Sequence, residues 1–157
     1  MKSSPYITVQ GMARLNAELE ERWQRRRDVV KALSAAAAEG DRSENAEYIY
    51  RKKELRGIDR RIRYLQKRMP DLRVISEKPD DQNVVFFAAK VRLETDEGRE
   101  VNYRIVGPDE IDHEKGNISL DSPLAQALLK KQVDDDVTIH VQQGRKTYSI
   151  IAISYQD

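Results

Sequence analysis

Residues 40–44 read Gly40-Asp41-Arg42-Ser43-Glu44 and separate two long segments whose apolar residues recur at three- and four-residue steps. At 100° per residue, this spacing places the apolar side chains of each segment on one face of a helix. The linking segment is too short for anything but an antiparallel return, so the two faces bury each other. The pattern predicts an antiparallel coiled-coil hairpin over residues 1–70, with residues 40–44 at its tip.

Two apolar stripes define the predicted helices, and each contains one arginine, Arg26 in the first and Arg51 in the second. The first stripe consists of Met12, Leu15, Leu19, Trp23, Val30, Leu33 and Ala37. The second consists of Tyr48, Leu55, Ile58, Ile62, Leu65 and Met69. Thr8 is the expected N-cap of the first helix, Gly40 its expected C′ residue, and Pro70 ends the second helix. Each helix is then roughly 25 residues, or about 38–40 Å, long.

Composition limits what else the chain can contain. Its 157 residues are 39% hydrophobic and 35% charged, which suits a slim coiled coil followed by one small globular domain. An apolar run long enough to span a membrane and an N-terminal signal pattern are both missing, so we expect a cytoplasmic protein with no membrane partner. The absence of cysteine excludes disulfides and thiolate metal sites.

The net charge of +1 conceals an asymmetry between the two halves. Residues 1–70 contain 17 Lys or Arg against 10 Asp or Glu, whereas residues 71–157 contain 11 against 17. The halves therefore have charges of +7 and −6. A basic, elongated N-terminal half favours polyanionic partners, and an acidic C-terminal half favours a protein surface or plain solvation.

Residues 83–157 have the two-residue period of strands. The predicted strands cover residues 84–93, 101–106, 118–120, 137–141 and 148–153. Ser122-Pro123 has the N-cap and N1 residues typical of a helix start, so one short helix follows the third strand. The expected fold is α+β, with an antiparallel sheet and one helix over residues 83–157 and a linker or edge segment over residues 71–82.

Asp41 and Glu44 place two carboxylates at the predicted tip, and two interpretations are open. The Asp-x-x-Glu spacing is a variant of the capping box, which stabilises a helix N-terminus. Alternatively, the pair shares a Mg²⁺ ion whose remaining ligands come from another macromolecule. His113 and His140 have no partner at ligand spacing, so the sequence offers no other cluster suited to catalysis.

A basic stripe follows the second predicted helix, opposite its apolar face. It consists of Lys52, Lys53, Arg56, Arg60, Arg63 and Lys67. Between residues 48 and 68, only Glu54 and Asp59 offset nine Lys or Arg. The excess positive charges repel one another unless a phosphate backbone neutralises them. Tyr64 and Ile49 lie toward the same exposed face, where Tyr64 is able to stack on a base. The alternative is an ordinary solvated helix face.

Five stretches of the chain resemble one protein family. They are residues 40–48 (GDRSENAEY), Lys52-Lys53, residues 58–65 (IDRRIRYL), residues 103–107 (YRIVG) and residues 118–125 (ISLDSPLA). Together they resemble the Gre transcript cleavage factors of bacteria, and within them the GreB branch, in which the basic run is stronger. The resemblance covers nearly the whole chain in the right order. Gly57 departs from the helix-favouring residue expected at its position.

The resemblance implies that the coiled coil enters the secondary channel of RNA polymerase and that an FKBP-like C-terminal domain docks at the channel rim. Asp41 and Glu44 correspond to the tip acids that help the polymerase hold a second Mg²⁺ during cleavage of backtracked RNA. The implied protein is no nuclease by itself, binds no metal alone and is a monomer. The basic patch that holds the nascent RNA 3′ end falls on Lys52, Lys53, Arg56 and Arg60. The polymerase-docking loop falls on Asp121, Ser122 and Pro123.

Three other functions are compatible with parts of the sequence. A regulator that occupies the secondary channel without cleavage shares the architecture. An FKBP-like fold also suggests a prolyl isomerase, but the only tryptophan, Trp23, is on the coiled coil and not in the domain that would need it. A coiled coil that binds RNA or DNA without polymerase is the third.

Overall fold

The computed structural model describes residues 3–40 and 45–156, which fold as two compact units. One unit is Met12–Leu72, and the other combines Met1–Gly11 with Arg73–Asp157. The chain therefore begins in the second unit, leaves it to form the helical hairpin, and returns to it at Arg73.

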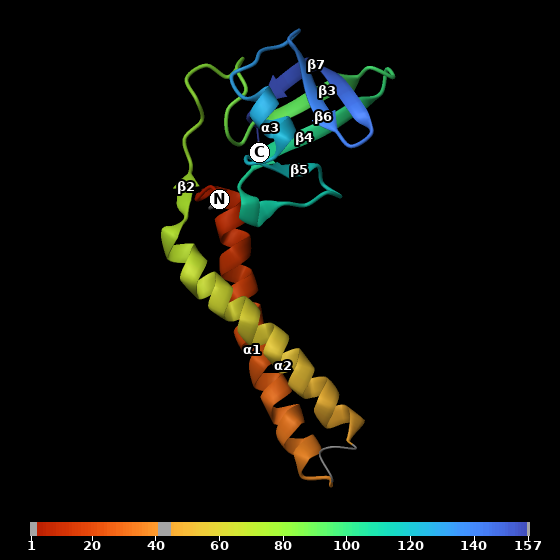
Figure 1. Ribbon diagram of the computed structural model, residues 1–157. Helices are drawn as coiled ribbons and strands as arrows, with labels where there is room; N and C mark the ends of the chain where they lie inside the picture. Colours follow the sequence, from red (N-terminus) through yellow and green to blue (C-terminus); the bar gives the residue numbers. More distant parts are fainter. Residues whose placement is uncertain (1–2, 41–44, 157) are drawn as a thin grey trace. The chain divides into compact units, whose positions relative to one another are not determined.

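The hairpin is formed by α1 (Val9–Ala37) and α2 (Ala46–Arg68), which run side by side in opposite directions (Figure 1). A 3-10 turn, η1 (Met69–Asp71), ends α2. These elements confirm the predicted hairpin. Within residues 3–40 and 45–156, no helix combines the length and the apolar character needed to cross a bilayer.

The structure confirms the predicted N-cap of α1 but not its predicted C′ residue. The Oγ1 atom of Thr8 accepts a hydrogen bond from the Gly11 backbone N–H at 3.0 Å, so Thr8 is the N-cap, as predicted. Gly40 has the positive φ of +142° that favours glycine, but it lies three residues after Ala37. The prediction that Gly40 is the C′ residue is therefore wrong, because the chain makes a further turn at residues 38–39 before reaching it.

A seam of alternating three- and four-residue steps joins the helices. On α1 it contains Met12, Leu15, Leu19, Arg22, Arg26, Val29, Leu33 and Ala36, all buried or half-buried. On α2 and the first residue of η1 it contains Tyr48, Arg51, Leu55, Ile58, Ile62, Leu65 and Met69, which confirms the predicted second stripe. This period of 3.5 residues is that of a coiled coil, in which each seam residue packs between residues of the facing helix.

The predicted first stripe is wrong in its middle and at its end. Trp23 is 38% exposed, and the most deeply buried positions of this stretch are Val29 and Ala36, one residue before the predicted Val30 and Ala37. The prediction followed apolar residues, whereas the coiled-coil period places the charged Arg22 in the seam. The structure therefore tolerates an arginine at a seam position and leaves a tryptophan outside it.

The second unit contains two sheets. A short parallel pair, β1 (Tyr6–Thr8) and β2 (Arg73–Ile75), joins the segments that precede and follow the hairpin. The larger sheet has five strands, in the spatial order β5 (Asn117–Ser119), β4 (Glu100–Val106), β3 (Lys90–Thr95), β7 (Gly144–Ser154) and β6 (Asp136–Val141). The short helix α3 (Pro123–Leu128) packs its leucines into the core of this sheet.

The larger sheet is mixed, so the prediction of a wholly antiparallel sheet is wrong in one strand. β4 and β5 run parallel, with Arg104 opposite Asn117. The connection between them passes through the 3-10 turn η2 (Pro108–Glu110), which gives the chain room to return to its starting direction. The other neighbouring strands pair antiparallel, and the one short helix is present as expected.

Residues 84–89 also differ from the prediction, which made them the first part of a strand. β3 begins only at Lys90, because Ala88 has a φ of +73° that interrupts extended backbone. The segment is nevertheless buried at Val85 and Ala89 and half-buried elsewhere. The Tyr155 hydroxyl holds it by donating to the Val84 carbonyl at 2.5 Å and accepting from the Phe86 N–H at 2.8 Å. An apolar run indicates burial but does not decide between strand and irregular backbone.

A buried carboxylate fastens the start of α1 to η2. Glu110 accepts hydrogen bonds from the Thr8 N–H at 3.0 Å and the Gly107 N–H at 2.7 Å, and its other oxygen contacts the Thr8 hydroxyl. A buried carboxylate is stable only with such donors. The backbone comes so close that a Cβ atom at Gly11 would lie 2.0 Å from Oε1 of Glu110.

Two glycines of the helices provide a test of this contact. We expect Gly11→Ala to lower the free energy of unfolding by about 2 kcal/mol, because Glu110 must give up hydrogen bonds to make room. Gly57→Ala has open space around the new Cβ and is expected to raise it by about 0.5–1 kcal/mol through helix propensity. Urea unfolding monitored by circular dichroism measures both. Equal stabilisation by the two substitutions would contradict the Glu110 contact.

Candidate nucleic-acid interface

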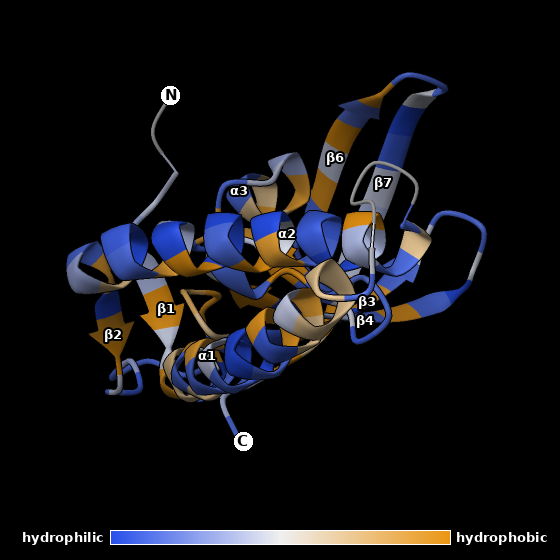
Figure 2. Ribbon diagram, turned by 90° about the horizontal axis from the view of Figure 1, so that it is seen from below, coloured by the Kyte–Doolittle hydropathy of each residue, from blue (hydrophilic) through white to orange (hydrophobic). Residues whose placement is uncertain are grey.

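The basic face of α2 lies opposite the seam. It consists of Lys52, Lys53, Arg56, Arg60, Arg63 and Lys67, all of them exposed. The strongly hydrophilic colouring along the outer side of α2 in Figure 2 corresponds to this face. The placement follows from the 3.5-residue period, because a helix that turns its apolar positions inward must turn these positions outward.

The two acids within this run are directed to the other helix. Glu54 is 2.7 Å from Nη2 of Arg25, and Oδ1 of Asp59 is 2.7 Å from Nε of Arg26. Both carboxylates therefore neutralise arginines of α1. Among the residues that the structure describes, none of the six cations of the basic face forms a salt bridge with a carboxylate.

Four of these cations surround an open groove of about 470 Å³ on α2. The groove is lined by Lys53, Arg56, Asp59, Arg60 and Arg63. Arginine and lysine side chains that converge without carboxylate partners attract phosphate groups, and the arginines are able to bind them through two parallel hydrogen bonds. The arrangement suits a flexible polyanion better than a compact small molecule, because it is shallow and extends along the helix.

Glu18 of α1 is the centre of a third cross-helix contact, which the sequence did not reveal. Its carboxylate accepts two hydrogen bonds from Arg61 of α2, at 2.7 and 3.0 Å, and one from Arg22 at 2.8 Å. The Arg61 hydrogen bonds hold the pKa of the Glu18 carboxyl below its ordinary value of 4.5, against the opposing effect of burial. Only the pairing of the two helices brings residues 18 and 61 together.

At the end of the hairpin, Asn45 joins the two helices. Its Oδ1 atom accepts a hydrogen bond from the Tyr48 N–H at 3.1 Å, which makes it the N-cap of α2. Its Nδ2 group donates to the Ala36 carbonyl of α1 at 2.7 Å. One side chain therefore satisfies a free N–H of α2 and gives a second donor to the Ala36 carbonyl of α1, which also accepts from the Glu39 N–H at 3.2 Å.

The predicted tip acids, Asp41 and Glu44, lie outside the described residues. The N-cap of α2, which one interpretation assigned to them, is formed by Asn45. Within the part of the chain that the structure describes, no group of three or more His, Asp or Glu residues is arranged to hold a metal ion.

The predicted docking residues surround the start of α3. Ser122 caps this helix, accepting from the Ala125 N–H at 3.3 Å, and Pro123 is its first residue, as the sequence predicted. Asp121 is exposed, and its carboxylate accepts a hydrogen bond from the Ser4 N–H at 2.9 Å and contacts the Ser4 hydroxyl. Both Asp121 and Ser122 therefore have local structural roles besides any contact with a partner.

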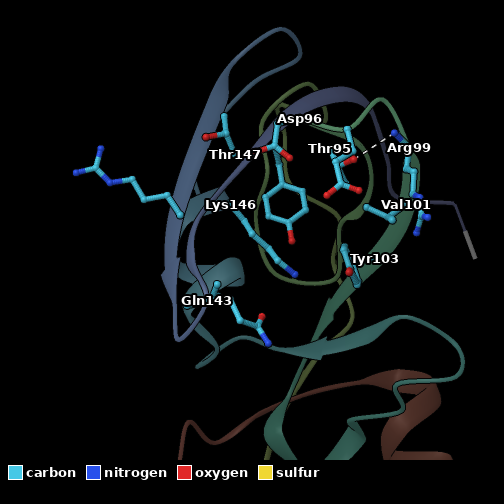
Figure 3. Close-up of a pocket in the computed structure, with 12 residues that line it drawn as sticks. Thr95, Asp96, Arg99, Val101, Tyr103, Gln143, Lys146 and Thr147 are labelled. Carbon is cyan, nitrogen blue, oxygen red and sulfur yellow. Dashed lines mark hydrogen bonds between the residues drawn. The ribbon is translucent and has the colours of Figure 1, made fainter.

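A second concave surface lies between two hairpins of the five-stranded sheet (Figure 3). It is lined by Thr95, Asp96, Glu97, Arg99, Val101, Tyr103, Val141, Gln143, Arg145, Lys146, Thr147 and Tyr148. Charged side chains of both signs and two tyrosines share this surface. It contains no tryptophan, since Trp23 belongs to the other unit.

Comparison with known proteins decides the family. Residues 5–74 match the family described as "Transcription elongation factor, N-terminal", and residues 79–155 match "Transcription elongation factor, GreA/GreB, C-term". The chain belongs to the GreA/GreB family of transcription elongation factors. The family expected from the sequence motifs is therefore confirmed.

Several relatives within the GreA/GreB family match almost end to end, among them three bacterial proteins named transcription elongation factor GreB. The protein from Xanthomonas axonopodis pv. citri is 57% identical over 156 residues, which cover 98% of this chain and 93% of that protein. The protein from Pseudomonas aeruginosa is 52% identical, with coverage of 97% and 91%. That from Haemophilus influenzae is 48% identical, with coverage of 99% of each.

The Glu18 contact predicts a pH-dependent stability. Because folding lowers the pKa of Glu18, its contribution is complete above pH 4.5 and is lost as the pH falls through the lowered pKa. We expect Glu18→Gln to lower the free energy of unfolding by about 1 kcal/mol at pH 7, and this difference should shrink as the pH falls below 4.5 and through the lowered pKa of Glu18. Urea unfolding at a series of pH values measures this. Glu20→Gln, an exposed position on the same helix, is the control and should change little at any pH.

The Asn45 bridge predicts a graded series of stabilities. Asn45→Ala removes both hydrogen bonds and should lower the free energy of unfolding by about 1–2 kcal/mol. Asn45→Asp keeps the cap acceptor and loses only the donor to Ala36, so its stability should lie between those of Asn45→Ala and the unsubstituted chain. Thermal unfolding monitored by circular dichroism ranks the variants. Asn16→Ala, at an exposed position of α1, is the matched control. Identical stability of Asn45→Ala and the unsubstituted chain would disprove the bridge.

Proposed function

We propose that the chain enters the secondary channel of RNA polymerase with its hairpin tip first and stimulates the polymerase's own cleavage of backtracked RNA. One observation carries the proposal: both halves of the chain match the GreA/GreB family, and a relative of 57% identity over nearly the full length is named GreB. A pair of long antiparallel helices is the kind of element that fits a channel.

In this proposal, Asp41 and Glu44 are the residues that act at the cleavage site. Two carboxylates provide the hard oxygen ligands that Mg²⁺ prefers, and Asp41 and Glu44 would hold the ion together with carboxylates of the polymerase. An ion held there would supply Lewis-acid chemistry for a water that attacks the phosphodiester. The N-cap supplied by Asn45 supports this role, because α2 does not need either acid as its cap. The chain alone is then no nuclease.

The basic face supports the same proposal. The extruded RNA 3′ segment is single-stranded and anionic, and Lys52, Lys53, Arg56 and Arg60 are exposed cations without a salt bridge to any described carboxylate. They hold the RNA while it is cut. The C-terminal unit binds the rim of the channel through Asp121, Ser122 and Pro123, which lie together at the start of α3.

Two other functions have less support. A prolyl isomerase needs an apolar pocket for the proline ring, but the concavity of the five-stranded sheet is lined by Asp96, Glu97, Arg99, Arg145 and Lys146 among others. A regulator that blocks the channel without cleavage shares the hairpin. Paired acids at residues 41 and 44 favour cleavage over blocking, and shortening of the RNA in a stalled complex separates these two activities.

The decisive experiment measures RNA cleavage in stalled elongation complexes with Mg²⁺. Asp41→Asn and Glu44→Gln should each reduce the stimulated rate at least about 100-fold, because each removes a charge that acts on the transition state. Binding to the polymerase should change less than about twofold. Glu39→Gln, an exposed acid close in sequence, is the control and should cleave normally.

Unchanged cleavage in both tip variants would refute the assigned roles of Asp41 and Glu44. If the unsubstituted chain shortened no RNA at saturating concentration, the cleavage function itself would be wrong, and a blocking regulator would take its place.

A further inference from the structure

Two exposed tyrosines lie on the outer side of α2. Tyr50 is 60% exposed and Tyr64 is 44% exposed. They are 14 residues apart, and Gly57 lies halfway between them, so all three positions share one face of the helix. These two rings lie outside the seam, so packing between the helices does not account for aromatic residues at these positions.

Each tyrosine lies beside an arginine that is itself held in place. The guanidinium carbon of Arg51 is 5.4 Å from the centre of the Tyr50 ring, and that of Arg61 is 5.3 Å from the centre of the Tyr64 ring. Arg51 is bonded to Glu47 and Glu54, and Arg61 is bonded to Glu18. These contacts fix the orientation of both rings at the surface and reduce the entropy lost when a ligand stacks on them.

The surface between the rings is open and positively charged. A Cβ atom built at Gly57 would have no heavy atom within 4 Å, so nothing projects between the tyrosines at this position. The groove lined by Lys53, Arg56, Arg60 and Arg63 lies along the same stretch of the helix. Aromatic rings next to a track of cations that no described carboxylate neutralises are the two components of a site for single-stranded nucleic acid.

We propose that Tyr50 and Tyr64 stack on two bases of a single-stranded RNA whose phosphates lie along the basic face. The inference deepens the proposed function, because it names how the extruded RNA is held. At 1.5 Å per residue the two positions are about 21 Å apart along the helix, so the rings contact two separate bases rather than neighbouring ones. Stacking is tolerant of sequence, which suits a factor that must accept any transcript.

A protein segment is the other ligand that exposed tyrosines could meet. RNA is favoured because the adjacent groove contains four cations and one carboxylate, and that carboxylate, Asp59, is already bonded to Arg26. A protein surface would have to supply several acids in a row, whereas every nucleotide supplies a phosphate.

The test measures binding of the full-length chain to a fluorescently labelled 12-nucleotide RNA at several salt concentrations. Tyr50→Leu and Tyr64→Leu should each weaken binding about tenfold at every salt concentration, since the base loses its stacking partner and the phosphate contacts persist. Tyr50→Phe and Tyr64→Phe keep the ring and should bind as the unsubstituted chain does. Arg56→Gln combined with Arg60→Gln should reduce the slope of log K against log[salt] by about 1.4.

The proposal is overturned if the leucine variants bind RNA as well as the phenylalanine variants do, or if the unsubstituted chain binds no RNA at about 50 mM salt. It is also overturned if the leucine variants lose affinity for polymerase that holds no extruded RNA, because the rings would then contact protein. Stimulated cleavage by the unsubstituted chain is measured in parallel. Normal cleavage together with any of these results means that the stacking inference fails while the proposed function stands.

Discussion

Arginines inside an otherwise apolar helix seam are the constraint on which the hairpin depends. Arg22, Arg26 and Arg51 occupy positions that the coiled-coil period assigns to the interface. A charge that is partly removed from water is stable only when a counter-charge and hydrogen bonds compensate it. Glu18, Asp59 and Glu54 provide that compensation from positions that flank the seam, at distances of 2.7–3.0 Å. Of these bonds, that of Arg26 to Asp59 crosses between the helices. Two arginines outside the seam form further bonds across the helices, Arg61 to Glu18 and Arg25 to Glu54, and all three favour one register.

This use of the acids explains the charge of the outer surface. α2 contains few carboxylates, and the structure directs Glu54 and Asp59 to arginines of α1. The cations on the outer face therefore have no local neutralisation within the described residues, and their mutual repulsion favours any phosphate backbone that approaches. The same two carboxylates, Glu54 and Asp59, thus contribute to the stability of the hairpin and to its capacity to bind a polyanion. They stabilise the hairpin by bonding to α1, and for the same reason they do not neutralise the outer face.

Several features of the fold and of the candidate site could be predicted from the sequence. The period of apolar residues predicted both helices and the complete stripe on α2, and the Ser122-Pro123 pair predicted the start of α3. Other features could not be predicted. The apolar run at residues 84–89 was expected to be a strand, but its backbone turns at Ala88. The parallel pairing of β5 depends on the path of a connection, which no local pattern encodes. Glu18 and Asn45 act on residues that are distant in sequence or on the other helix.

By itself, the sequence determined that a helical hairpin with a basic second helix precedes a small α+β domain, because hydrophobic period and charge are properties of the local chain. It also placed two acids between the helices. Only the tertiary structure decided which arginines enter the seam, which carboxylates neutralise them, and that Asn45 rather than an acid caps α2. It likewise decided that Glu110 holds the start of α1. These outcomes depend on which side chains folding brings within hydrogen-bonding distance of one another. The separation of two residues along the chain does not determine the distance between them in the folded protein.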